Sequence, residues 1–137
     1  MNARTLAGLA AGLMAAFGTS AGGCVPDLPG GGRKLESARY TVKYRALPER
    51  IPMGQHFSLE LAVCASAGAP LPESVSVDAR MPEHRHGMNY RASVTREAGG
   101  RYRADGLMFH MPGRWELVFD LRAAGRTDRL TQSELIE

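Results

Sequence analysis

Apolar and polar side chains alternate along most of the chain from residue 37 onward, and this period of two is typical of strands with one buried face. The pattern is clearest in residues 55–65, where Phe57, Leu59, Leu61 and Val63 alternate with polar or small residues. Prolines and glycines interrupt it at short intervals, as turns between strands do. The predicted strands cover residues 38–46, 55–65, 74–81, 89–95, 100–108, 114–122 and 126–135. About seven short antiparallel strands predict an all-β fold, an immunoglobulin-like β-sandwich.

The first 21 residues follow a different pattern, which is typical of a cleaved signal peptide. Arg4 precedes an apolar stretch over residues 6–17, and residues 19–21 supply the small side chains that signal peptidases accept. This stretch is too short for a transmembrane span, which needs about 20 apolar residues. We therefore expect a signal peptide at 1–21, a flexible Gly/Pro-rich leader at 22–36 and the β-sandwich domain at 37–137. The mature chain, with no transmembrane segment, is then expected in the periplasm.

The two cysteines, Cys24 and Cys64, allow two interpretations. In an exported protein they are expected to form a disulfide, and a closed loop of about 40 residues contributes about 3 to 4 kcal/mol in the chain-entropy view. Alternatively, residues 21–24 form a degraded lipobox, and acylation of Cys24 would anchor the protein to a membrane as a lipoprotein. The sequence leaves both interpretations open.

The charge distribution argues against nucleic-acid binding. Removal of Arg4 with the signal peptide leaves 16 basic residues against 14 acidic ones, so the mature domain is nearly neutral. Its arginines are scattered through the predicted strands and form no phosphate-binding patch in the sequence. We do not expect an enzyme either, because no nucleophile, base and orienting residue occur at a spacing that indicates an active site.

Histidine and methionine are concentrated in two stretches between predicted strands. Residues 81–89 read MPEHRHGMN, and residues 110–113 read HMPG. In an extended backbone His84, His86 and Met88 point to the same side, where they can bind one ion. Imidazole together with thioether sulfur favours a soft metal, copper and above all Cu(I). His110 and Met111 would complete this site if the two loops meet.

Other histidines and methionines have simpler explanations. Met81 and Met108 follow the inward rhythm of their predicted strands and are expected in the core. His56 falls on the polar face of its strand and is expected to be exposed, and Met53 has no partner in the sequence. Taken alone, His84 among charged neighbours is also compatible with a loop whose hydrogen bonds fix a turn.

The first of the two stretches resembles the marker motif of the YtkA-like or FixH-like periplasmic domains, which are small exported sandwiches with a Met-Pro-x-His-x-His-Gly-Met type motif. The matching residues are Met81, Pro82, His84, His86, Gly87 and Met88. The likeness continues through residues 100–102, 109–113 and 115–117. It implies a role in copper handling or in the assembly of cytochrome oxidase. Unlike the membrane-anchored FixH type, this chain is expected to retain no membrane span after cleavage of its signal peptide.

These observations predict a periplasmic copper-binding protein, either a chaperone or a sequestering agent. The first expected ligands are His84, His86 and Met88, and the second are His110 and Met111. The alternative is a non-catalytic interaction module, whose Met-rich loop docks on a periplasmic or membrane metalloprotein and assists its assembly.

Overall fold

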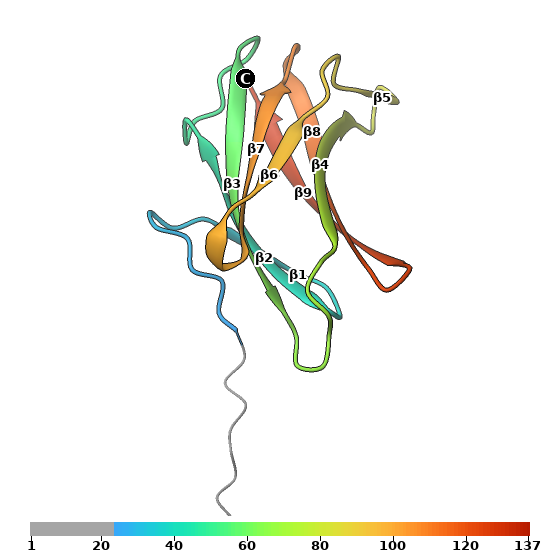
Figure 1. Cartoon of the computed structure of the whole chain (residues 1–137). Helices are drawn as coiled ribbons and strands as arrows, with labels where there is room; N and C mark the ends of the chain where they lie inside the picture. The colour runs from blue at the N-terminus through green and yellow to red at the C-terminus, as the bar shows by residue number, and fades with distance from the viewer. Residues whose placement is uncertain (1–23) are drawn as a thin grey trace, which may run out of the picture.

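A computed structural model describes residues 24–137, which fold as a β-sandwich (Figure 1). The predicted signal peptide, residues 1–21, lies outside the described residues. Residues 24–137 contain nine strands and one short 3-10 helix. They are β1 (Arg33–Glu36), β2 (Tyr40–Leu47), β3 (His56–Ala65), β4 (Ser74–Met81), β5 (His86–Gly87), β6 (Ser93–Arg96), η1 (Ala98–Gly100), β7 (Arg101–Met108), β8 (Gly113–Ala123) and β9 (Arg126–Ile136). Within this range no helix is long and apolar enough to cross a bilayer.

The strands form two antiparallel sheets that pack face to face. The larger sheet has the order β1-β2-β3-β7-β6, and the smaller has the order β5-β4-β8-β9 (Figure 1). β3 and β4 follow each other in sequence but lie in different sheets, so the chain crosses from one sheet to the other, as in immunoglobulin-like folds. The predicted fold class is confirmed, with two more short strands than expected.

Apolar and polar side chains alternate along the strands, so each sheet has one apolar face, and the core lies between these two faces. In β4 every second side chain, from Val75 to Met81, is buried, and the residues between them are exposed. The other sheet contributes Tyr40, Leu59 and Leu61, and β8 contributes Trp115, the only tryptophan of the chain. Each large apolar side chain buried in this way stabilises the fold by about 1.5 to 3 kcal/mol.

The segment predicted as a flexible leader is partly ordered onto the domain. Residues 33–36 form β1, which pairs with β2, and the side chain of Leu28 is buried. A disulfide joins Cys24 to Cys64 near the end of β3. Gly32 sits so close to β2 that a Cβ atom there would lie 2.5 Å from the carbonyl oxygen of Tyr44. The glycines that suggested flexibility therefore permit close backbone approach.

A β-bulge in β7 changes which of its side chains face the core. Before the bulge Tyr102 and Ala104 are buried, whereas after it Leu107 is buried and Met108 is half-exposed. The pairing shifts between Phe57 and Leu59 of β3, so that two residues of β7 lie opposite one of β3. Gly106 takes the left-handed conformation that such a bulge needs, with φ of +84°. The expectation that Met108 lies in the core was therefore wrong.

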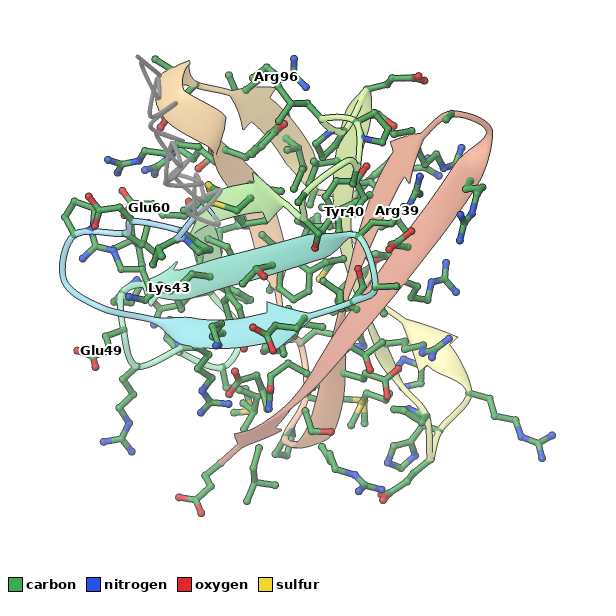
Figure 2. All side chains as sticks on the ribbon, turned by 90° about the horizontal axis from the view of Figure 1, so that it is seen from below. Arg39, Tyr40, Lys43, Glu49, Glu60 and Arg96 are labelled. Carbon is green, nitrogen blue, oxygen red and sulfur yellow. A yellow bond between two sulfur atoms is a disulfide. The ribbon has the colours of Figure 1, made fainter. Side chains whose placement is uncertain are left out.

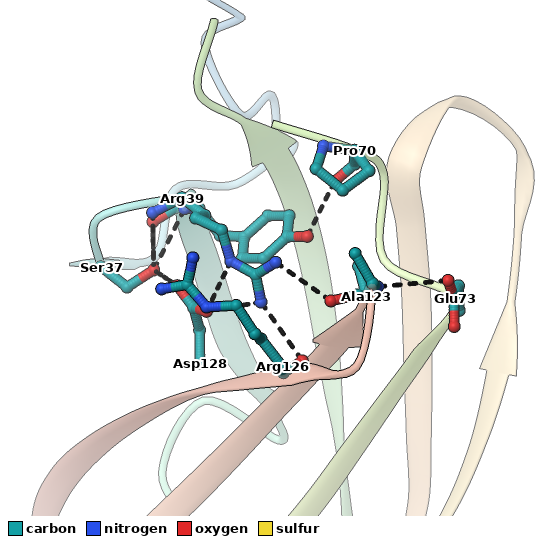
Figure 3. A network of polar contacts seen from close by, with 9 residues as sticks. Ser37, Arg39, Pro70, Glu73, Ala123, Arg126 and Asp128 are labelled. Atoms are coloured by element: carbon teal, nitrogen blue, oxygen red, sulfur yellow. Dashed lines mark hydrogen bonds and ion pairs between the residues drawn. The ribbon is translucent and has the colours of Figure 1, made fainter. Parts of the chain in front are cut away.

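One end of the sandwich is fastened by a polar network, shown in Figure 3. Arg39 donates from Nε to Asp128 at 2.8 Å and from its terminal nitrogens to the backbone carbonyls of Ala123 and Arg126. The Ser37 hydroxyl also donates to Asp128, at 2.6 Å. The guanidinium of Arg39 lies over the ring of Tyr40 at the start of β2. Figure 2, which views the molecule from below, labels the two residues side by side. We call this end of the sandwich the clamp end, because these contacts join the start of β2 to the β8–β9 turn.

Candidate metal site

The opposite end of the sandwich carries the loop that contains His84 and His86. β4 ends at Met81, and the next residue, Pro82, lacks the N–H that a continuing strand would donate. The His84 amide donates to the Met81 carbonyl at 3.2 Å and closes a turn. The chain then returns as β5, in which His86 pairs with Met81. This end, where β4 and β7 end and β3 and β8 begin, is called the donor end.

The loop is a turn and not the extended segment that the sequence analysis assumed. Arg85 lies between the two histidines with φ of +53°, a left-handed conformation that costs a residue with a side chain about 1 to 3 kcal/mol. An ion pair between Glu83 and Arg114, with 2.5 Å between the charged atoms, connects the loop to the start of β8. The turn brings the rings of His84 and His86 together, with centroids 5.9 Å apart.

His110 reaches the same place from the segment that joins β7 to β8. Its ring centroid lies 5.4 Å from that of His86, so the two loops that the sequence analysis expected to meet do meet. Both rings lie at the edge of Trp115, with His110 at 5.3 Å and His86 at 5.9 Å between centroids. The three imidazoles therefore form a row in which His86 and His110 lie against the buried tryptophan and His84 contacts only His86 among these rings; we call it the row over Trp115.

Trp115 provides a rigid floor for this row. It is fully buried and stacks on Phe109 with 4.8 Å between ring centroids. Its indole N–H donates to the backbone carbonyl of Met111 at 3.0 Å, which fixes the segment after His110. Close packing extends to Gly113, where a Cβ atom would lie 2.8 Å from the Cε of Met81. These contacts of Trp115 and Gly113 thus restrict the movement of the backbone segment that carries His110.

One ring nitrogen of the row has no partner in the described structure. The Nδ1 atom of His110 is buried and makes no hydrogen bond. Such an atom usually costs about 1 to 3 kcal/mol, and buried polar groups are otherwise nearly always paired. By contrast, Nδ1 of His86 lies 3.1 Å from the carbonyl oxygen of Gly87. Among the described residues, no hydrogen-bond partner competes with a ligand for Nδ1 of His110.

The ring spacings fit shared binding of one ion. An ion about 2 Å from an imidazole nitrogen lies about 3 Å from the ring centroid, so two rings on one ion have centroids about 5 to 6.5 Å apart. Both measured spacings, 5.9 and 5.4 Å, fall in this interval. Within residues 24–137, however, no three His, Cys, Asp or Glu side chains are arranged as a complete metal site. An ion held here would need further donors, and thioether sulfur is the type that lies nearby in sequence.

The two predicted methionine ligands are half-buried. Met88 follows β5, and its amide donates to the carbonyl of Ala79 at 3.3 Å. Met111 lies between His110 and β8, and both methionines pack against the hydrophobic core. The structure therefore brings His84, His86 and His110 together and places Met88 and Met111 beside them in the chain. The cysteines take no part, because both are in the disulfide.

Residues set aside in the sequence analysis also lie at the donor end. His56 and Met108 are direct cross-strand partners in β3 and β7, and the ring of His56 contacts that of Tyr90 at 4.8 Å between centroids. The amide of Gly54, next to Met53, donates to the carbonyl of Phe109 at 2.8 Å. The concentration of His and Met in the sequence was the only signal that could have pointed to these residues. Their proximity depends on the strand register, which the sequence pattern does not show.

Comparisons with known proteins agree with this architecture. The profile of the YtkA-like family matches residues 35–119, which is more than half of the chain. A search of curated proteins finds no significant match. Among solved structures, a DUF4426 family protein from Pseudomonas aeruginosa PAO1 superposes with a TM-score of 0.50 at 11% identity, covering 78% of this chain and 97% of that one. At this identity the likeness shows a shared fold. The family match and the sandwich establish that this chain belongs to the YtkA-like family.

Proposed function

We propose that this protein binds copper as Cu(I) in the periplasm and passes it on without catalysing a reaction. The observation that carries the proposal is the row of three imidazoles over Trp115, in which the buried Nδ1 of His110 has no hydrogen-bond partner. The family supports an exported domain of this kind, and the donor chemistry supports the metal.

The types of donor favour Cu(I) over the common alternatives. Imidazole with thioether sulfur is a soft, neutral set, whereas zinc would prefer thiolate or carboxylate beside the imidazoles. The only cysteines are joined to each other, and Glu83, the acidic residue of the loop, is paired with Arg114. His84, His86 and His110 would supply the nitrogens, and rotation of the Met88 or Met111 side chain would supply sulfur.

The position of the row suits exchange of the ion with a partner. His84 is exposed, whereas His86 and His110 are half-buried, so accessibility falls along the row. An incoming ligand can replace one imidazole while the other two nitrogens still hold the ion. Each step substitutes one neutral donor for another, so the ligand exchanges leave the charge of the copper site unchanged until the ion itself leaves.

A second candidate function is a non-catalytic interaction module that assists the assembly of a metalloprotein. The exposure of Met53 and Tyr90, each 46% accessible at the donor end, favours it because exposed large apolar side chains often mark contact surfaces. Such a module would bind its partner equally well with and without a copper chelator.

The decisive experiment uses the single tryptophan as a reporter. The purified exported protein, with its disulfide intact, is titrated anaerobically with Cu(I) and separately with Zn(II), and Trp115 fluorescence and native mass are recorded. We expect one tightly held Cu(I) and a change in Trp115 emission, because two candidate ligands contact its ring. The double variant His84→Gln/His86→Gln should lose affinity by about 100-fold or more, since two ligands are removed.

The fourth histidine provides the matched control. His56→Gln removes an imidazole from the same end of the sandwich but not from the row over Trp115, so tight binding and the fluorescence change should persist. The thermal transition of each metal-free variant checks that the fold is intact. Absence of bound copper at micromolar concentration, or unchanged affinity in the His84/His86 double variant, would refute the copper proposal.

A further inference from the structure

Soft donors are confined to one end of this molecule. Of the described residues 24–137, every histidine and every methionine lies at the donor end. They are His56, His84, His86, His110, Met53, Met81, Met88, Met108 and Met111. Three of them form the row over Trp115, and Met81, the cross-strand partner of His86, is buried. The row leaves His56, Met108 and Met53 without a role.

His56 and Met108 form a pair on the outer face of the larger sheet. They are direct partners in the antiparallel pairing of β3 and β7, which puts their Cβ atoms about 4.5 to 5.5 Å apart on the same face. That face is outward, because their neighbours Phe57 and Leu107 are buried. The bulge at Gly106 produces this arrangement, since it reverses the alternation of β7 before Met108.

The surroundings of the pair hold it in place. The ring of His56 meets the edge of Tyr90 at an interplanar angle of 75°. Met53 lies in the loop before β3, whose Gly54 amide is hydrogen-bonded to the carbonyl of Phe109. Met108 precedes His110 by two residues, a step of about 7 Å in an extended chain. The pair is therefore close in the chain to His110, the half-buried end of the row, and its His56 is exposed to solvent.

We propose that His56 and Met108, assisted by Met53, form a second and weaker Cu(I) position through which the ion enters and leaves the His84/His86/His110 row. This inference rests on the proposed function. Cu(I) accepts a small set of soft donors, and one imidazole with one or two thioethers meets that requirement. Transfer between the positions exchanges one neutral donor for another, so no electron or proton moves.

The test compares stoichiometry and release rate in matched double variants. Native mass spectrometry with excess Cu(I) should show two ions on the natural protein, and one on either His56→Gln/Met108→Leu or His84→Gln/His86→Gln. Release of the tight ion to the chelator bathocuproine disulfonate should be at least 10-fold slower in His56→Gln/Met108→Leu, with its affinity unchanged. The exposed and half-exposed positions of these two residues favour an intact fold, which the thermal transition of the metal-free variant verifies.

The possible results separate the two proposals. One tight ion on the natural protein, released at the same rate by the His56/Met108 variant, would overturn the second position and leave the proposed function standing. No Cu(I) on the natural protein would overturn both. A third substitution, Met53→Leu, should slow release by a smaller factor if Met53 assists the outer position, and leave the rate unchanged if it does not.

Discussion

At the scale of the residue, His110 combines a structural cost with a binding opportunity. Its Nδ1 atom is buried without a partner, and its ring contacts the rings of both His86 and Trp115. The ring cannot leave easily, because Phe109 before it is buried and Met111 after it accepts the hydrogen bond of the tryptophan. A site that needs an unshared lone pair must tolerate this cost in the metal-free protein.

The substitution His110→Phe tests that trade-off. It removes the unpaired nitrogen and keeps an aromatic ring beside Trp115. The free energy of unfolding of the metal-free variant should therefore be about 1 kcal/mol higher than that of the natural protein. For a domain of about 100 residues this raises Tm by several degrees. Copper affinity should fall at the same time, as measured by Trp115 fluorescence. A metal-free variant less stable than the natural protein would contradict the interpretation.

At the scale of the element, the bulge in β7 determines which side chains reach the donor end. Without it, strict alternation from Tyr102 and Ala104 would bury Met108 and His110 and expose Leu107 and Phe109. Ser58 fastens the bulge by donating to Asp105 at 2.5 Å, and Arg103 pairs with the same carboxylate. Gly106 supplies the left-handed backbone.

Gly106→Ala should therefore weaken both stability and copper binding. A Cβ atom there would meet only the Arg91 carbonyl oxygen at 3.7 Å, an ordinary contact, so the penalty is the strained φ, of about 1 to 2 kcal/mol. The matched control is Gly125→Ala in the β8–β9 turn, where φ is +69° and nothing lies within 4 Å. Urea unfolding should show a similar loss in the free energy of unfolding for both variants. Only the Gly106 variant should bind copper more weakly than the natural protein. Equal affinities would show that the bulge does not position the donors.

At the scale of the whole molecule, the two ends of the sandwich differ in how completely their polar groups are paired. The clamp end satisfies its polar groups, with Arg39 and Asp128 both largely buried and fully paired (Figure 3). The disulfide adds a covalent connection close to the end of β3. The donor end instead has an unpaired nitrogen and a strained Arg85. The polar groups of the clamp end are thus paired, whereas the donor end keeps an unpaired nitrogen.

Acid should weaken the clamp in a defined pH range. The hydrogen bond from Ser37, together with Arg39, holds the pKa of Asp128 below its usual value despite the opposing effect of burial. A carboxyl whose pKa is lowered by folding stabilises the protein above its unfolded pKa of about 3.9, and this contribution is lost as the pH falls from about 5 through the folded value.

The substitution Asp128→Asn isolates this contribution. It should lower the free energy of unfolding by about 1 to 3 kcal/mol at pH 7, because Arg39 loses its charged partner. The difference from the natural protein should shrink toward pH 3, as followed by urea unfolding at several pH values. Asp120, whose pKa is lowered by Arg129, retains its own acid sensitivity in the variant. A difference in the free energy of unfolding between variant and natural protein that stays constant with pH would contradict the role assigned to Asp128.

The sequence by itself determined the sandwich and the residue types of the candidate site. The alternation in β2, β3, β4 and β8 specified strands because a half-buried strand repeats every two residues, and β4 matches its predicted bounds, 74–81. The stretch with His84 and His86 was recognisable because its composition differs from the rest of the chain. The order within the Gly/Pro-rich leader was not predictable, because β1 depends on pairing with β2.

Only the tertiary structure decided how the donors are grouped. A bulge adds one residue without changing composition, so the sequence could not show that Met108 and His110 would face away from the core. The meeting of His86 with His110 joins two loops that are 24 residues apart in the sequence, and it depends on the packing of both rings against Trp115. The pairing of His56 with Met108 depends on strand register, which is set by long-range contacts and not by the local pattern.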